Sequence, residues 1–402
     1  MSDRRQVGTS LVPGRGGSVL VLSMRRLSDL VAFCVQYEFE DVVTEVTGAD
    51  RVDVGDRRSL ELSRRAYKLA RFATGSRRLA RASAPPPSRV KLERDYELFF
   101  AVFNNAYELF ALAAVPEWRR RSRVAACFIN EVWAHLLPGY LLELLSEFDH
   151  VFVGLRHPVD EIARIVGRPC SYLPMAVDVV RFAPLPDTPR AIDICSIGRR
   201  SEVTHAALVR LARERRIFYH YDTVAASGAD RKQRTFRVGE ASEHRLLLAS
   251  LLQRARYFIS NRSLVNAPEF TRGREEIAPR FYEGAAAGAV MLGEPPRTEE
   301  FTSQFGWPDA VIRLPFDSPD VGDVMAELDR DPERLARIRA DNVRNSALHH
   351  DWVHRLRTVF QTLGIAPTES MLERERRLKG LAASVLPASA ASAPASVAAR
   401  AS

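Results

Sequence analysis

Two glycine-containing stretches carry the residues best suited to hold a phosphorylated ligand. The first is the apolar run of residues 192–197, which ends at Gly198 and is followed by Arg199 and Arg200. A glycine permits a tight turn there, and the amides of the next helix then form a site for anions. The two guanidinium groups could each bind a diphosphate through paired hydrogen bonds. A solvated arginine pair after a strand is an equally weighted alternative.

The second stretch covers residues 280–293 and reads as a helix followed by an apolar strand. The helix carries Glu283 and stops at Gly288, a residue type that often ends helices in the left-handed conformation. A carboxylate near the start of such a helix faces the ligand edge of its domain and can accept hydrogen bonds from both hydroxyls of a ribose. The small residues 284–287 let the helix approach a sheet or a ligand closely. An exposed Glu283 on an ordinary capped helix is the alternative.

Short β-like runs alternate with amphipathic helical stretches along most of the chain, a pattern typical of parallel, doubly wound sheets. The expected strands are 19–22, 98–103, 124–129, 151–153 and 171–174, then 192–197, 218–221, 257–260, 289–292 and 311–314. Three prolines in residues 182–189 mark a linker. We therefore predict an α/β protein of two Rossmann-like domains that face each other across a cleft, because ligands bind at the carboxyl ends of such strands.

The domain boundaries follow from this division. The expected segments are a flexible arm (1–17), an N-terminal Rossmann-like domain (18–178) with a basic insertion (57–87), a linker (179–189), a second Rossmann-like domain (190–350), closing helices (351–380) and a disordered tail (381–402). The tail is expected to be disordered because Ala, Ser and Pro dominate it and cannot build a core.

The composition is that of a soluble globular protein, with 46% apolar and 27% charged residues. The apolar runs are too short to span a bilayer, and the run at 18–24 is too short and too soon followed by arginine for a signal peptide. Four scattered cysteines without a CxxC pair indicate thiols in a reducing compartment. We therefore expect a cytoplasmic protein.

A basic surplus gives the chain a net charge of +8. Residues 57–81 hold nine basic residues and one acidic residue, interleaved with Leu60, Leu62, Tyr67, Leu69 and Phe72. Together with the arginines at 119–121 and 123, this segment could contact anionic lipid at the inner membrane face or bind a phosphorylated acceptor. A solvated helix face is the more favoured alternative. No aromatic stacking platform accompanies the arginines, so nucleic acid is not an expected partner.

Residues 283–288, Glu-Gly-Ala-Ala-Ala-Gly, resemble the Glu-Ala-Met-Ala-x-Gly helix of the retaining, group-1 branch of GT-B glycosyltransferases. That branch has another glutamate eight positions upstream, where this chain has Glu275, with Glu276 one position out of register. The Gly198–Arg199 pair is similar to the Gly-Arg loop of the family. The lysine that commonly follows this loop is absent, and Arg200 or His205 would take its place.

The likeness covers roughly residues 19–363 and is strongest from Phe148 onward. Residues 173–184 are similar to the Pro, Gly-Val-Asp and Phe-x-Pro elements that lead into the family's linker, with Ala176 in place of the glycine. Residues 349–355 resemble the closing helix of a bacterial subgroup related to spore-coat glycosyltransferase-like proteins.

This resemblance implies a hexosyltransferase-like enzyme that transfers a sugar from a nucleotide-diphosphate sugar to an unidentified acceptor, such as a glycan, a lipid-linked sugar or a small molecule. The second domain would bind the donor and the first the acceptor. Glu283 would bind the ribose, and Glu275 would lie near the hydroxyls of the donor sugar. The donor-binding set implied is Gly198, Arg199, Arg200, Arg280, Glu283 and Gly288.

Catalysis by such an enzyme requires stabilisation of the negative charge that develops on the departing nucleotide diphosphate. Arg199 and the amides of a helix N-terminus would provide it. No Asp-x-Asp triplet stands where a metal-bridged diphosphate would need one, so neither a metal nor another cofactor is expected.

On the acceptor side, residues 126–133 read as a strand whose carboxyl edge delivers Asn130 and Glu131 to the cleft. Glu131 is the candidate for a carboxylate that activates the acceptor or contacts its sugar. A charge at a helix N-terminus is an equally weighted interpretation of Glu131. The alternative candidates are His135, His150 and His157.

Two other classes of function remain open. A nucleotide-sugar epimerase would share the donor site and release the sugar unattached. A catalytically inactive GT-B protein with a binding or coat role would keep the fold and lose the chemistry.

Overall fold

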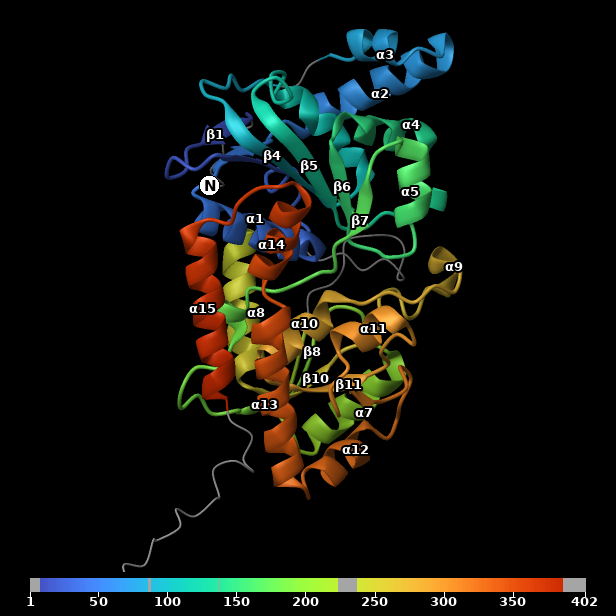
Figure 1. Ribbon diagram of the computed structural model, residues 1–402. Helices are drawn as coiled ribbons and strands as arrows, with labels where there is room; N and C mark the ends of the chain where they lie inside the picture. Colours follow the sequence, from blue (N-terminus) through green and yellow to red (C-terminus); the bar gives the residue numbers. More distant parts are fainter. Residues whose placement is uncertain (1–7, 86–87, 137, 223–236, 386–402) are drawn as a thin grey trace, which may run out of the picture. The chain divides into compact units, whose positions relative to one another are not determined.

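The computed structural model describes residues 8–85, 88–136, 138–222 and 237–385, which form two compact units (Figure 1). The first unit comprises the described residues of Met1–Asp178, Val224–Leu247 and Trp352–Glu375. The second comprises those of Val179–Thr223, Leu248–Asp351 and Arg376–Ser402. The chain therefore leaves the first unit after Asp178 and returns to it twice.

The first unit is built on a sheet in which the structure describes seven strands, in the order β1-β3-β2-β4-β5-β6-β7. All neighbours are parallel except β1 and β3. The strands are β1 (Ser10–Val12), β2 (Val19–Ser23), β3 (Asp50–Asp53), β4 (Tyr96–Phe103), β5 (Ser122–Ile129), β6 (His150–Val153) and β7 (Cys170–Tyr172). β2 is buried along its whole length, as expected for a strand covered on both faces.

Helices cover both faces of this sheet. On one face, Phe39 of α1 (Cys34–Thr47) contacts Phe100 of β4 and Phe128 of β5 with ring centroids 5.7 Å apart, and it stacks on Trp352 of α14 (Trp352–Thr362) at 4.4 Å. On the other face, Phe99 of β4 stacks on Trp118 at 4.7 Å. The remaining helical elements of this unit are η1 (Val31–Phe33), α2 (Arg57–Thr74), α3 (Arg77–Ser83), η2 (Ala106–Ala114), η3 (Ala134–Leu136), α4 (Gly139–Leu142), η4 (Glu143–Glu147) and α5 (Val159–Val166).

The second unit is built on a parallel sheet in which the structure describes five strands, in the order β12-β11-β10-β8-β9. They are β8 (Ile192–Ser196), β9 (Tyr219–Tyr221), β10 (Ala255–Ile259), β11 (Val290–Gly293) and β12 (Ile312–Arg313). The strand order reverses between β8 and β10. In doubly wound sheets, ligands bind outside the carboxyl ends of the strands at this reversal.

Alternate residues of the β strands in the second unit face different helices. Ile194 and Tyr257 lie in a core with α7 (Glu202–Arg213), α12 (Val321–Leu328) and α13 (Pro332–His349). Phe258 and Met291 face α10 (Pro279–Ala286) instead. The shorter helices are α6 (Val179–Phe182), α9 (Pro268–Thr271) and α11 (Glu299–Gln304), while α8 (Ala241–Gln253) and α15 (Glu369–Ser384) contribute residues to both units.

The predicted fold class is confirmed, and each expected strand is present as one of β2, β4, β5, β6, β7, β8, β9, β10, β11 and β12. The structure adds β3 and β1, so the expected arm is wrong for residues 10–12, where the backbone pairs with β3. The basic insertion forms α2 and α3, and α15 continues to Ser384, beyond the expected start of the tail. Residues 1–7 and 386–402 lie outside the described residues. Within the described ranges, no helix is both long and apolar enough to cross a membrane.

A buried ion pair holds the first unit together across segments distant in sequence. Glu38 of α1 accepts a hydrogen bond from Arg245 Nε at 2.7 Å, from Trp352 Nε1 at 3.2 Å and from the Asp178 amide at 2.8 Å. The exposed fractions of the Arg245 and Glu38 side chains are 3% and 0%. Removing one member of such a pair leaves the other charge buried, which is strongly destabilising.

We expect Glu38→Ala to lower the free energy of unfolding by about 3–5 kcal/mol, measured by urea denaturation followed by circular dichroism. The matched control is Glu61→Ala, which breaks the Arg57–Glu61 pair whose side chains are 63% and 47% exposed. This control is expected to cost less than about 0.5 kcal/mol because water screens the pair. Equal losses in the two variants would contradict the role assigned to Glu38.

Candidate functional site

The candidate site lies at the carboxyl edge of the sheet in the second unit, where the strand order reverses. Gly198 follows β8, and Ser260 and Arg262 follow β10. Gly293 ends β11 with a φ of +157°, and a Cβ there would overlap the backbone oxygen of Ser260. A glycine is therefore required where these two strand ends come together.

The turn after β8 has the conformation that the sequence predicts. Gly198 has a φ of +89°, in the left-handed region that favours glycine. Its amide donates a hydrogen bond to Asp222 Oδ2 at 2.6 Å. The Gly198 amide is therefore already bonded to a carboxylate, and the amides to which the sequence analysis assigned an anion follow this turn.

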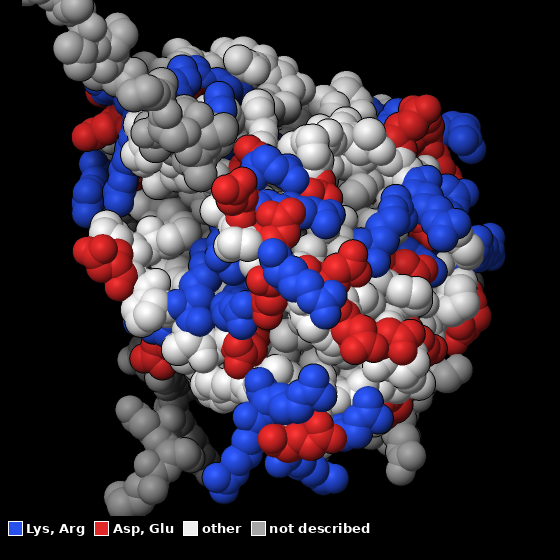
Figure 2. Space-filling model, turned by 90° about the horizontal axis from the view of Figure 1, so that it is seen from below, with Lys and Arg blue, Asp and Glu red and all other residues white. Residues whose placement is uncertain are grey.

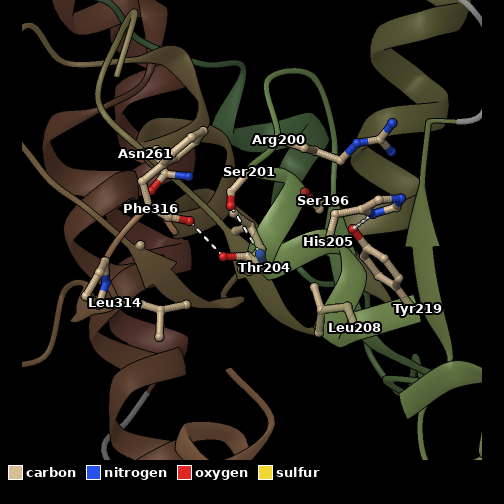
Figure 3. Close-up of a pocket in the computed structure, with 13 residues that line it drawn as sticks. Ser196, Arg200, Ser201, Thr204, His205, Leu208, Tyr219, Asn261, Leu314 and Phe316 are labelled. Carbon is tan, nitrogen blue, oxygen red and sulfur yellow. Dashed lines mark hydrogen bonds between the residues drawn. The ribbon is translucent and has the colours of Figure 1, made fainter. Parts of the chain in front are cut away.

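The helix that follows this turn is held by its cap. Ser201 is the N-cap of α7: its Oγ accepts a hydrogen bond from the Thr204 amide at 3.1 Å and donates one to Asp317 Oδ1 at 2.6 Å. Thr204 Oγ1 donates to the Phe316 oxygen at 2.7 Å (Figure 3). These bonds fix the start of α7 against the segment after β12.

A small cavity lies between α7 and the strand ends (Figure 3). Its lining includes Ser196, Thr204, His205, Tyr219 and Asn261. The volume is about 10 Å³, which is room for roughly one water molecule. A nucleotide-sized ligand would therefore have to bind over the open edge of the sheet and not inside this cavity.

Arg280 and Glu283 form the central ion pair of the edge. Both lie on α10, and Arg280 Nη1 donates to Glu283 Oε2 at 2.5 Å. Glu283 is 1% exposed, whereas the Arg280 side chain is 22% exposed. A Cβ placed on Gly198 would lie 3.7 Å from Arg280 Nη2, so the same guanidinium reaches the turn after β8. The structure thus brings together Gly198, Arg280 and Glu283.

The close approach of α10 to the sheet positions this pair. A Cβ on Gly284 would lie 2.8 Å from Phe258 Cδ1 and 2.9 Å from Met291 Sδ, so no larger residue fits without movement. Gly288 follows the other end of α10 with a φ of +62°, where a Cβ would lie 2.8 Å from Val343 Cγ2. Gly288 therefore ends the helix against α13, and the structure does not group it with Gly198 and Arg280.

The other predicted arginines have different partners. Arg199 is exposed, and its Nη1 donates to Asn266 Oδ1 at 3.1 Å. Arg200 Nη1 donates to the Asp222 oxygen at 2.7 Å, and its guanidinium lies 5.2 Å from the centroid of the Tyr221 ring. His205 Nδ1 lies 3.0 Å from Tyr219 OH (Figure 3). The assignment of the missing family lysine's place to Arg200 or His205 stays a prediction, and the guanidinium of Arg280 also reaches the Gly198 turn.

Glu275 belongs to a second cluster of charges at the same edge. Its Oε2 accepts a hydrogen bond from the Arg297 amide at 2.6 Å, and its Oε1 lies 3.4 Å from Arg262 Nε. Arg262 also pairs with Glu294 at 2.9 Å. Glu276 is 8% exposed. Glu275 thus contacts Arg262 and Arg297, whereas Glu283 pairs with Arg280.

Glu131 lies in the first unit, after β5. It is exposed, and its Oε1 accepts a hydrogen bond from Trp133 Nε1 at 2.8 Å. His157 lies against the ring of Trp133 at 4.8 Å between centroids, and His135 lies at 6.2 Å. His150 Nε2 is 2.9 Å from Ser171 Oγ, and burial lowers the pKa of His150.

The sequence analysis missed Glu108, a carboxylate beyond the carboxyl end of β4. It accepts hydrogen bonds from the Asn104 amide at 2.7 Å and from Asn104 Nδ2 at 2.9 Å, and burial raises its pKa to about 7. Asn105 Oδ1 accepts from the Tyr107 amide at the start of η2. The spacing Asn105-x-x-Glu108, which is typical of a helix cap, could have indicated this residue in the sequence.

Part of the chain that forms this edge matches a known protein family. Residues 237–361 match the family described as glycosyl transferase-like. This segment contains Glu275, Arg280, Glu283 and Gly288, and it ends well after β12. Over residues 237–361 the chain is therefore similar to glycosyl transferase-like proteins, and this match supports the resemblance predicted from the sequence. The spore-coat subgroup stays a prediction.

Two solved structures are similar to the chain at low identity. One is a TarM mutant of S. aureus in complex with fondaparinux, α-GlcNAc-glycerol and UDP, with 9% identity and a TM-score of 0.42 over 66% of this chain and 55% of TarM. The other is the glycotransferase of kitacinnamycin, with 13% identity and a TM-score of 0.38 over 87% of this chain and 99% of that chain. The chain thus spans about half of the TarM length (55%). No curated protein matches it in sequence. The fold assignment rests on the strand orders of the chain itself.

We expect a double-mutant cycle on Arg280→Met and Glu283→Gln to show an energetic coupling of about 1–3 kcal/mol in the free energy of unfolding. Arg280→Met alone removes the guanidinium from a buried carboxylate, and the neutral side chain of the Glu283→Gln background should largely abolish that loss. Urea denaturation of the two single variants and the double variant measures the coupling. If the losses in free energy of unfolding of the two single variants simply add in the double variant, the Arg280–Glu283 pair does not contribute to stability.

Proposed function

We propose that the protein is a glycosyltransferase that binds a nucleotide-diphosphate sugar at the carboxyl edge of its second unit. The observation that carries this proposal is the meeting of three groups: the left-handed Gly198 turn, the guanidinium of Arg280 and the buried carboxylate of Glu283. A turn amide and a cation suit a diphosphate, and a carboxylate suits the hydroxyls of a ribose. The match of residues 237–361 to a glycosyl transferase-like family supports the same proposal.

Each residue of the edge has a role in this proposal. The Gly198 amide, the start of α7, Arg199 and Arg280 would bind the diphosphate, and a phosphate oxygen would replace the Asp222 carboxylate at the Gly198 amide. Glu283 would bind the ribose. Glu275, with Arg262 beside it, would contact the donor sugar. Arg200 would hold the segment after β9 through its bond to Asp222.

The reaction proposed is transfer of the glycosyl group to an acceptor hydroxyl. The bond between the anomeric carbon and the diphosphate oxygen breaks, a bond to the acceptor oxygen forms, and the acceptor proton passes to a base. Glu131 is the proposed base because its carboxylate is exposed after β5, the place where the acceptor domain was expected to present it. The arginines would stabilise the negative charge of the departing diphosphate without a metal ion.

The first test is a thermal-shift screen with UDP-, GDP-, dTDP- and ADP-sugars. A donor at one hundred times its dissociation constant should stabilise the protein by about 2.7 kcal/mol. Arg199→Ala and Glu283→Gln should reduce this stabilisation. Arg216→Ala, a change to an exposed arginine of the second unit, should leave it intact. No stabilisation by any nucleotide sugar, or equal stabilisation of all variants, would refute the proposed donor site.

The same preparations distinguish the classes of function. Donor-dependent transfer or slow donor hydrolysis that persists in EDTA supports the metal-independent transferase. Loss of activity in EDTA with recovery on adding Mg²⁺ would contradict metal independence. An isomerised nucleotide sugar formed without acceptor would favour an epimerase, and donor binding without turnover by any acceptor would favour an inactive binding protein.

A further inference from the structure

α2 and α3 present an unusual row of exposed apolar side chains. Leu62, Leu69 and Phe72 of α2 are 58%, 72% and 74% exposed, and Leu79 of α3 is 54% exposed. Phe72 and Leu69 are the two most exposed large apolar side chains among the described residues. The spacing of 62, 69 and 72 places the three α2 residues on one helix face.

The opposite face of α2 already has its packing partners. Leu60, Ser63 and Tyr67 are buried, and the ring of Tyr67 lies 5.3 Å from that of Phe110 in η2. The helix is therefore apolar on its buried side and again on its outer side. The first apolar face explains the fold of the insertion. On the second, the ring of Phe72 lies 6.3 Å from that of Tyr140, edge to face, and remains 74% exposed.

The exposed apolar residues alternate with exposed cations. Arg58, Arg65, Lys68 and Arg78 are all exposed, and none of the four forms an ion pair within the described ranges. Residues 58, 62, 65, 69 and 72 follow one another at intervals of four and three, so cations and apolar side chains share one face. We call this set, Arg58, Leu62, Arg65, Lys68, Leu69, Phe72, Arg78 and Leu79, the α2–α3 face.

The arginines of a second basic segment in the first unit pair with neighbouring acids. The arginines at 119–121 and 123 pair with Asp149, Glu117, Asp95 and Glu97 respectively. Figure 2 shows a different face, seen from below the view of Figure 1, on which basic and acidic side chains also lie interspersed. These pairs offset the charge of residues 119–123, whose contact with lipid stays a prediction, whereas the four cations of the α2–α3 face form no ion pair within the described ranges.

We propose that the α2–α3 face binds the surface of an anionic lipid bilayer. Its four apolar side chains would enter the boundary between headgroups and acyl chains, and its four cations would contact the anionic headgroups. An interfacial helix combines these two features, since burial of apolar side chains and attraction to anionic lipid add in binding. Each Lys or Arg near such a surface raises the partition coefficient about fivefold. A free phosphate would account for the cations and leave the apolar row without a partner.

The test is co-sedimentation of the full chain with vesicles of phosphatidylcholine, with and without phosphatidylglycerol, at low and high salt. The wild type should bind the anionic vesicles at low salt, bind neutral vesicles weakly, and lose affinity as salt screens the cations. Leu69→Ser/Phe72→Ser should lower the partition coefficient at least about tenfold, because two apolar side chains no longer enter the lipid.

Two matched controls separate this face from the rest of the surface. Leu246→Ser/Leu247→Ser changes two leucines that are 60% and 59% exposed in α8. The charge variant of the α2–α3 face replaces its four cations by Gln: Arg58, Arg65, Lys68 and Arg78. Its control removes the same amount of charge from four exposed positions of the second unit, by changing to Gln Arg210, Arg213, Arg215 and Arg330. The controls should retain binding, while the charge variant of the α2–α3 face should lose at least about tenfold.

Three outcomes would overturn the proposal. They are absence of binding to anionic vesicles by the wild type, equal losses in the control variants, and full binding by both α2–α3 variants. Sedimentation velocity tests the competing occupant, a second copy of the chain. A dimer abolished by Leu69→Ser/Phe72→Ser, without vesicle binding by the wild type, would assign the face to self-association instead.

Discussion

The candidate site depends on one ion pair and on the close packing that fixes it. Arg280 bonds to a carboxylate that is 1% exposed, and its other guanidinium nitrogen reaches the Gly198 turn. The position of this cation is therefore set by a buried group and not by a flexible surface contact. α10 can hold Glu283 there only because Gly284 lets the helix lie against Phe258 and Met291. Packing of small residues thus determines where positive charge stands at the edge of the sheet.

The two units use charge in opposite ways. In the second unit, the acidic and basic groups at the sheet edge bind one another: Arg262 pairs with Glu275 and Glu294, and Asp222 accepts from the Gly198 amide. A polar ligand can bind there by exchanging partners with groups that are already in position. In the first unit, α2 and α3 leave cations and apolar side chains exposed together, which suits a partner that brings both negative charge and an apolar environment.

Much of the fold could be predicted from the sequence because the ten expected strands are short, mostly apolar runs that alternate with amphipathic helical stretches. β3 could not be predicted, because its sequence, Asp50-Arg51-Val52-Asp53, is mostly charged. In the structure, Asp50 bonds to Arg94 and Tyr96, and Asp53 bonds to Arg51.

For the candidate site, the Gly198 turn and the α10 helix were also predicted. The family resemblance placed Arg280 and Gly198 in one donor-binding set, but the sequence pattern alone could not predict their approach, because it joins residues far apart in sequence and depends on how closely α10 packs. The spacing between Glu275 and Glu283 could be seen in the sequence. Their different partners could not be predicted, because Arg262 and Arg297, which contact Glu275, are not part of the family motif.

The most direct measurement is isothermal titration calorimetry of the nucleoside diphosphate and of the corresponding nucleoside, for the wild type and Arg280→Met. If Arg280 binds the diphosphate, the variant should bind the diphosphate at least about tenfold more weakly, the size expected for a charged hydrogen bond. Its affinity for the nucleoside, which lacks the phosphates, should be almost unchanged. An equal weakening of both ligands, or no weakening of either, would contradict the claim that Arg280 and the Gly198 turn form the diphosphate site.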